Sequence, residues 1–182
     1  MGIVARKDSS IWGVEKRSWK GVWITPGATA FTRMFSSASS FARPRVAVLA
    51  FCREVVPLMR AKGQGGSIIN VSSVAARHGG GPGAYLYAGA KGFVSTATRG
   101  LAKDLAPDRI RVNAVSPGVI QTPFHDRFST PQLLESFKAG IPMARLGEPD
   151  DCVGAFLYLA SPQLSGYVTG QILEVNGGQY MP

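Results

Sequence analysis

The stretch SIINVSS at residues 67–73 decides the fold of this chain. Its apolar, β-branched run at 67–72 predicts a short strand that is covered on both faces, as the strands of parallel sheets are. A loop rich in glycine and proline follows at 79–83. Beyond this loop, residues 86–106 carry apolar side chains at helical spacing as far as Pro107, which predicts a helix ending there. A strand, a loop and a helix in this order form the unit from which parallel sheets are built.

Further elements extend this unit in both directions. They are helices at 46–61, 131–139 and 149–160, and strands at 110–115 and 171–175. This order predicts an α/β fold whose parallel strands are joined by helical crossovers. Ligands bind such sheets beyond the carboxyl ends of the strands. The chemistry is therefore expected directly after Ser72, Val115 and Val175.

The chain changes character near residue 45. Residues 1–45 are basic and rich in serine and show no sustained apolar period, so we leave them unassigned, with disorder as one alternative. Residues 46–182 are expected to form the folded part. Its first helix should bury an apolar side made of Leu49, Val56 and Met59.

Composition and charge narrow the classes of function. The chain has 182 residues, enough for one domain with a substantial core, and a formal net charge of +9. Eight basic and two acidic residues fall within 1–45, and the rest is nearly balanced. This distribution favours a basic terminal segment over a nucleic-acid-binding face, although a basic arm that binds nucleic acid stays a minor alternative. No run of about 18 apolar residues is present, so we expect no membrane span.

The cysteines and histidines indicate neither disulfides nor a metal site. Cys52 and Cys152 lie far apart and form no CxxC pair, which favours a reduced, cytoplasmic setting. His78 and His125 are single, without a second ligand at metal spacing, so surface or loop positions are expected for them.

Three polar side chains near the first strand and its helix suggest a proton-transfer site. Tyr87 and Lys91 are four residues apart on the predicted helix and therefore share a face. A free tyrosine has a pKa of about 10, and a fixed cation favours the phenolate. Ser73, at the strand end, could hydrogen-bond a substrate oxygen where charge develops. Taken alone, the Tyr-x-x-x-Lys spacing favours a solvent-facing pair. The serine at the strand end, the glycine-rich loop and the predicted helix shift the interpretation toward a proton-transfer site.

Five motifs then follow one another in order. They are GSIINVSS at 66–73, YAGAK at 87–91, IRVNAVSPGVIQT at 110–122, RLGEP at 145–149 and VTGQILEVNGG at 168–178. With these motifs, residues 46–182 resemble the C-terminal two-thirds of the short-chain dehydrogenase/reductase family. The resemblance implies part of a Rossmann-like, doubly wound parallel sheet with flanking helices. It also implies that 46–182 is the catalytic and C-terminal part of such a domain.

The resemblance implies a role for each of the three polar side chains. Tyr87 would be the general acid/base, Lys91 would be its partner and a donor to a ribose hydroxyl, and Ser73 would orient the substrate oxygen. NAD or NADP would supply the hydride, because no side chain can. The substrate would be a small carbonyl or secondary alcohol, such as a 3-oxoacyl thioester, a sugar or a steroid-like ring.

The resemblance also makes 117–122 the loop that meets the nicotinamide, although a loop merely leaving a strand would look similar. Its implied contacts come from Pro117 and Gly118, from backbone groups near Val119 and Ile120, and from the hydroxyl of Thr122. Residues 124–146 would be a lid over the substrate.

Gly89, Gly92 and Gly100 weaken a helix, and close approach of a second helix would compensate. In the resembling family this helix packs against its mate in a dimer, so the resemblance implies a homo-oligomer.

The N-terminal part departs from the family pattern. Residues 22–32 keep only Thr25 and Gly27 of the glycine-rich turn that receives a pyrophosphate, and no asparagine stands near Pro44, where the family has a further catalytic one. An upstream truncation, a deletion or a misread frame would each explain this. Two functions follow: an NAD(P)-dependent oxidoreductase, or a non-catalytic relative that binds a partner or a complete homologue through its helices.

Overall fold

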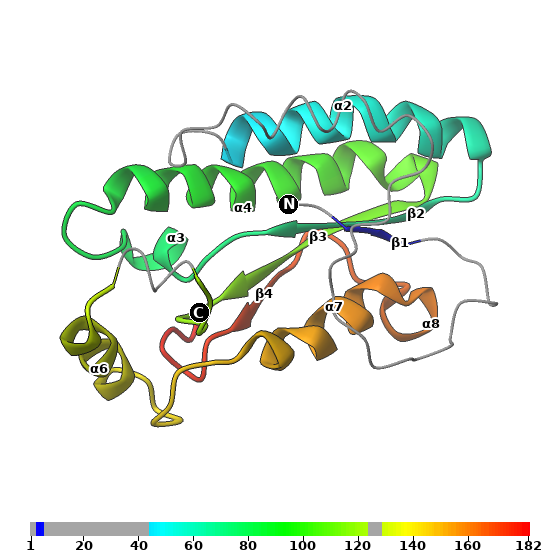
Figure 1. The fold of residues 1–182 in the computed structure, drawn as a ribbon. Coiled ribbons are helices and arrows are strands. Elements are labelled where there is room, and N and C mark those ends of the chain that lie inside the picture. The colour runs from blue at the N-terminus through cyan, green and yellow to red at the C-terminus, as the bar shows by residue number, and fades with distance from the viewer. Residues whose placement is uncertain (1–2, 6–43, 124–128) are drawn as a thin grey trace.

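The computed structural model describes residues 3–5, 44–123 and 129–182, and these form a layered α/β fold (Figure 1). Helices cover both faces of one sheet. On one face lie α2 (Pro44–Lys62) and α4 (Tyr85–Leu105), and on the other lie α7 (Val153–Ala160) and α8 (Pro162–Ser165). This confirms the doubly wound α/β arrangement with flanking helices.

The parallel part of the sheet contains three strands. β2 (Gly66–Val71) pairs with β3 (Ile110–Pro117), and β3 pairs with β4 (Ile172–Val175), in each case in parallel. Every strand predicted from the sequence is found within two residues of its expected ends. The carboxyl ends of all three strands meet at one edge, where a ligand of such a sheet is expected.

A further strand covers the free side of β2. This strand, β1 (Ile3–Ala5), runs antiparallel to it and pairs Val4 with Ile68. It lies within the segment that the sequence left unassigned, because a run of three residues shows no readable period. It gives backbone partners to an edge that would otherwise present unpaired amides and carbonyls.

The helices begin and end close to their predicted positions. α6 (Pro131–Ala139) has its predicted bounds, and the Thr130 hydroxyl caps it by accepting a hydrogen bond from the Leu133 amide. The helix predicted at 149–160 is divided into the 3-10 turn η2 (Pro149–Cys152) and α7. A second 3-10 turn, η1 (Ala106–Asp108), connects α4 to β3. The single-turn helix α3 (Ala75–His78) was not predicted, because four residues carry no periodic signal.

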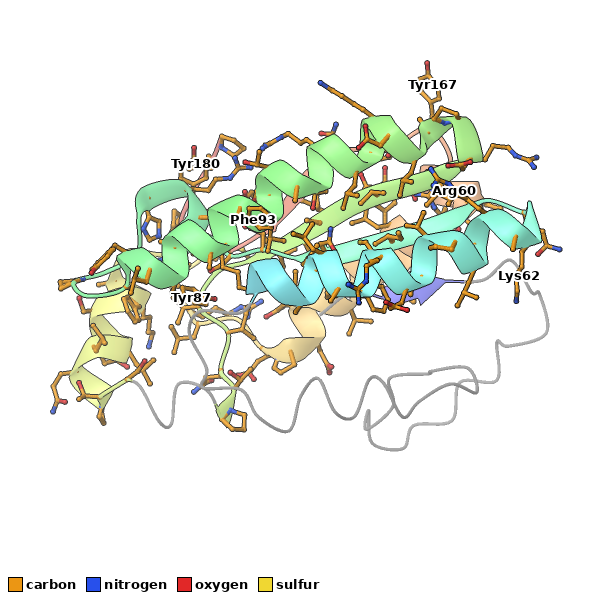
Figure 2. All side chains as sticks on the ribbon, turned by 90° about the horizontal axis from the view of Figure 1, so that it is seen from above. Arg60, Lys62, Tyr87, Phe93, Tyr167 and Tyr180 are labelled. Atoms are coloured by element: carbon orange, nitrogen blue, oxygen red, sulfur yellow. The ribbon has the colours of Figure 1, made fainter. Side chains whose placement is uncertain are left out.

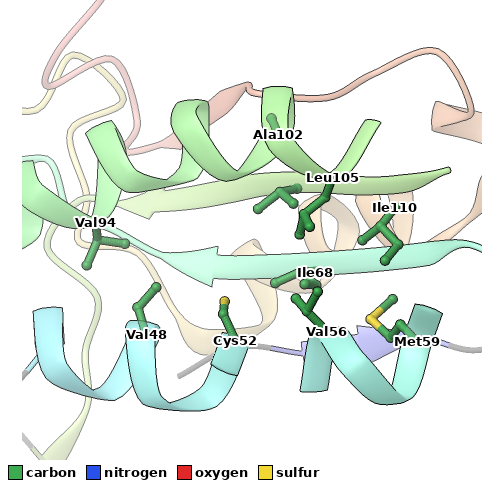
Figure 3. Packing of buried hydrophobic residues seen from close by; sticks show 10 residues of the cluster. Val48, Cys52, Val56, Met59, Ile68, Val94, Ala102, Leu105 and Ile110 are labelled. Atoms are coloured by element: carbon green, nitrogen blue, oxygen red, sulfur yellow. The ribbon is translucent and has the colours of Figure 1, made fainter. Parts of the chain in front are cut away.

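The larger core cluster lies between the sheet and the α2–α4 pair (Figure 3). From α2 it takes Val48, Cys52, Val56 and Met59. The prediction for Val56 and Met59 is confirmed, but that for Leu49 is wrong, since Leu49 is 51% exposed. Val48 takes the buried place, because the i, i+4, i+8 row that starts there, rather than one residue later, faces the sheet.

A smaller cluster lies on the opposite face, where Ile69 and Val115 pack against Leu159 of α7. The strands are thus buried on both faces, as the apolar run at 67–72 predicts. In the described part of the chain, no helix combines the length and the apolar character that crossing a membrane requires.

Candidate active site

The end of β2 is fixed to the middle of α4 by serine and lysine side chains. The Ser72 hydroxyl lies 2.7 Å from the hydroxyl of Ser95 and donates to the Lys91 carbonyl at 3.2 Å. The Lys91 ammonium in turn donates to the carbonyl of Val71 at 2.8 Å. Ser72 therefore ties helix to strand, which leaves Ser73 as the serine that leads into the loop.

Ser73 and Lys91 are both substantially buried. Ser73 is 8% exposed, and its hydroxyl accepts a hydrogen bond from the Ala75 amide at 3.2 Å. Burial lowers the pKa of Lys91 from its ordinary 10.5 to about 8. An ammonium has three donors, and Val71 takes one of them. The others can serve a ligand at this end of the sheet.

Tyr87 lies in the first turn of α4, half-buried, at the end of the helix where β2 stops (Figure 2). The Lys91 ammonium lies 5.8 Å from the centroid of its ring. This is within the range of a cation–π contact, which confirms that the i, i+4 spacing brings the two side chains together.

The predicted cofactor loop begins beside Ser73. The Val74 amide donates to the Pro117 carbonyl at 2.9 Å, and the Gly118 amide donates to the Val175 carbonyl at 2.9 Å. A Cβ at Gly118 would lie 2.7 Å from the Cβ of Asn176, so the two strand ends approach closely enough to demand glycine.

The loop continues as a short parallel bridge. The Val119 carbonyl accepts from the Gly147 amide at 2.9 Å, and the Gln121 amide donates to the Gly147 carbonyl at 2.8 Å. In a parallel bridge of this kind, the amide and carbonyl of the intervening Ile120 point to the opposite side. Val119 is buried, whereas Ile120 and Thr122 are partly exposed.

The RLGEP motif holds Gly147 in this bridge. Arg145 makes a bidentate ion pair with Asp151, with both nitrogen–oxygen distances 2.7 Å, and the Glu148 amide donates to the same carboxylate. These bonds keep the pKa of Asp151 well below its usual range, the guanidinium being the largest cause. The predicted lid at 124–146 includes α6, whereas its first five residues lie outside the described part.

Two buried asparagines hold the backbone on either side of β4, one before the strand and one after it, and the sequence predicts no role for either. Asn113 of β3 donates to the Val168 carbonyl at 2.9 Å and accepts from the Gln171 amide at 3.0 Å. Asn176 donates to the Tyr180 carbonyl and accepts from the Gly178 amide, which shapes the turn facing Gly118. An asparagine inside a predicted buried strand is the signal that could have identified Asn113.

A three-layer parallel fold with a Tyr–Lys pair beyond the strand ends is typical of Rossmann-like oxidoreductases. A family model described as enoyl-(acyl carrier protein) reductase matches residues 39–179. The chain belongs to the short-chain dehydrogenase/reductase family.

Individual relatives agree with this. The chain is 44% identical over 124 residues to the 3-oxoacyl-(acyl-carrier-protein) reductase FabG of Thermotoga maritima, a match covering 68% of this chain and 49% of the relative. The solved 3-ketoacyl-(acyl-carrier-protein) reductase from Brucella melitensis complexed with NADH is 37% identical, with a TM-score of 0.66, over 74% of this chain and 53% of the other.

A third relative has another described activity. A gluconate 5-dehydrogenase from Burkholderia cenocepacia, solved with NADP and tartrate, is 32% identical with a TM-score of 0.66, over 70% of this chain and 49% of the other. The chain spans about half the length of the relatives it matches.

Proposed function

We propose that this chain acts as an NAD(P)-dependent oxidoreductase that interconverts a carbonyl and a secondary alcohol. The observation that carries the proposal is the bond from the Lys91 ammonium to the Val71 carbonyl. This bond sets a partly buried cation beside the Tyr87 ring, at the end of the strand that leads into Ser73. A cation and a phenol held together beyond the carboxyl ends of parallel strands suit proton transfer to a substrate oxygen.

In the proposed reduction, each side chain acts on the substrate oxygen or on the group beside it. The Ser73 hydroxyl donates to the carbonyl oxygen and orients it. The Tyr87 hydroxyl gives its proton to this oxygen as negative charge develops there, and takes a proton back in the reverse direction. The positive charge of Lys91 stabilises the phenolate left behind. The bound nicotinamide supplies or accepts the hydride.

The described residues fit the nicotinamide end of such a cofactor. The amide and carbonyl of Ile120 point away from the Gly147 bridge, and Gly118 lets this loop pass close to Asn176. Thr122 offers a hydroxyl from the same loop, and the Lys91 ammonium has two donors besides the one that Val71 accepts. Because one solved relative holds NADH and another NADP, we propose a dinucleotide of this type without choosing between them. The counterpart of the glycine-rich turn, at 22–32, lies outside the described residues.

We propose a 3-oxoacyl thioester as the first substrate class to test, because two of the relatives are named as reductases of that kind. A sugar-derived alcohol is the second, because a gluconate dehydrogenase shares the fold. We also propose a cytoplasmic setting, since Cys52 and Cys152 are free thiols.

We further propose that two copies associate through α4. Among the described residues, a Cβ added at Gly89, Gly92 or Gly100 meets nothing within 4 Å. Close packing within the described part of the chain therefore does not explain these glycines, which each cost roughly 1 kcal/mol relative to alanine in a helix. A second helix against this surface would compensate for that cost.

The test is a titration of the purified chain with NADH and NADPH, followed by turnover of acetoacetyl-coenzyme A. We expect saturable binding, and a loss of kcat of at least about a hundredfold in Tyr87→Phe. The matched control is Tyr85→Phe, which removes the hydroxyl of a tyrosine that is 70% exposed on the same helix.

The outcomes separate the two functions. Turnover that Tyr87→Phe removes and Tyr85→Phe preserves supports the oxidoreductase. A folded chain that binds neither nucleotide at millimolar concentration would instead indicate the non-catalytic relative that binds a partner.

A further inference from the structure

The short helix α3 carries an ion pair that the catalytic proposal does not use. Arg77, in its third position, donates from Nε to the Glu174 carboxylate of β4 at 2.7 Å. The side chains are only 20% and 10% exposed, and the two residues are 97 positions apart in the chain. The Arg77 guanidinium also lies 5.7 Å from the centroid of the Tyr180 ring, within cation–π range.

The Glu174 carboxylate has Arg77 as its hydrogen-bond partner among the described residues. Its second carboxylate oxygen is buried and has no hydrogen-bond partner among the described residues, and the same is true of the hydroxyl of Ser116. Ser116 is the register partner of Glu174 on β3, so the two side chains share one face of the sheet. A carboxylate in such surroundings depends on Arg77 for compensation of its charge.

α3 has little to stabilise it on its own. It is one turn of four residues, in which the Ser73 hydroxyl accepts from the first amide, that of Ala75, and a single turn is unstable in isolation. It packs against α4, and two links tie it to the sheet: the bond from the Val74 amide to the Pro117 carbonyl, and the ion pair. The first anchors the start of the turn to β3, and the second anchors its third residue to β4.

Ser73 lies at the start of this turn, and its carbonyl accepts from the Ala76 amide at 2.9 Å. On the other side, β4 meets the cofactor loop where the Val175 carbonyl accepts from the Gly118 amide. The ion pair therefore closes a ring of contacts that runs from Ser73 through α3 and β4 to the loop at 117–122.

We propose that Arg77 and Glu174 are positioning residues, which fix α3 on β4 and thereby set the hydroxyl of Ser73 for the substrate oxygen. This inference rests on the proposed function for its catalytic consequence. Its structural part, that the pair holds α3, does not depend on catalysis.

The experiment compares Arg77→Met with Arg60→Met. Arg60 makes an ion pair of the same length with Asp108, 2.7 Å, but it is more exposed and lies at the opposite end of the molecule from Tyr87 (Figure 2). Hydrogen exchange is followed in the peptide that contains the bonded amides of Ala76 and Gly79. We expect this exchange to become at least about tenfold faster in Arg77→Met and to stay unchanged in Arg60→Met.

The catalytic part is tested in two backgrounds with acetoacetyl-coenzyme A and the nucleotide that binds. We expect Arg77→Met to lower kcat by about tenfold to a hundredfold with little change in the Kd of the nucleotide. In a Ser73→Ala background, the same change should cost at most about twofold more, because its effect acts through Ser73. Arg77→Lys keeps the positive charge and should restore part of the loss; it also replaces Arg77→Met if that variant does not fold.

Unchanged exchange in α3 would overturn the inference, and so would an equal loss of kcat in both backgrounds. A wild-type chain without turnover would contradict the proposed function instead, and the exchange measurement would then still decide whether the pair holds α3.

Discussion

The ammonium nitrogen of Lys91 lies 2.8 Å from the carbonyl oxygen of Val71, the last residue of β2. This bond crosses from helix to strand at the point where the strand ends. It brings a cation into a buried position, and the resulting loss of hydration lowers the pKa of Lys91 to about 8. Because the pKa of Lys91 is lower in the folded chain than in the unfolded one, the free energy of unfolding depends on pH.

Stability should therefore depend on pH through Lys91. Between about pH 8 and 10.5 the unfolded chain still binds the lysine proton that the folded chain has released, so the free energy of unfolding should rise with pH across this window. The rise is expected to be on the order of 2–3 kcal/mol. Urea unfolding at a series of pH values should show it in the wild type and not in Lys91→Met. The control Lys103→Met changes an exposed lysine of the same helix and should retain the rise.

Gly118→Ala should destabilise the fold and impair nucleotide binding. Its Cβ would lie 2.7 Å from the Asn176 Cβ and 2.8 Å from the Asn176 Cα, so backbone must shift. We expect a loss of about 1–3 kcal/mol in the free energy of unfolding. Gly154→Ala, at an exposed helical glycine with open space around it, should instead stabilise by about 0.4–1 kcal/mol. Equal effects of the two substitutions in denaturant unfolding would contradict the close approach.

Asn113→Ala should be strongly destabilising. It removes the partner of the Gln171 amide and the closer of two donors to the Val168 carbonyl, at a side chain that is 0% exposed. We expect a loss of about 2–4 kcal/mol, because two hydrogen bonds to the backbone are lost and the shortened side chain leaves a void. Thermal and urea unfolding would measure it. Gln171→Ala, whose own side chain is exposed, should change stability by less than about 0.5 kcal/mol, and an equally small effect of Asn113→Ala would refute the prediction.

Light scattering after size-exclusion chromatography should show the wild-type chain as a dimer or larger oligomer. Gly100→Leu should shift the distribution toward the monomer, because a bulky side chain on α4 prevents close approach of a second helix. This variant should fold, since a side chain at position 100 meets none of the described residues. Gly154→Leu is the matched change on α7. A monomeric wild type at micromolar concentration would contradict association through α4.

Local patterns predicted the elements and part of the site. The strands and the longer helices lie within about two residues of their expected bounds, since short β-branched apolar runs and a 3.6-residue apolar period are both visible in the sequence. Tyr87 and Lys91 could be paired in advance because they belong to the same helix, where a spacing of four fixes their relation. The loop at 117–122 followed from its place after a strand and from the resemblance to the family.

Long-range packing decided the rest. Leu49 and Val48 are both apolar, and the orientation of α2 against the sheet decides which of them is buried. The partner of Glu174 is 97 residues away on a helix too short to be predicted. The sequence alone determined the longer helices and the three parallel strands, because that information is local, whereas the short elements β1 and α3 were not determined by it. The burial of Lys91, the roles of Asn113 and Asn176, and the pairing of Arg77 with Glu174 depend on contacts between distant segments, which only the tertiary structure brings together.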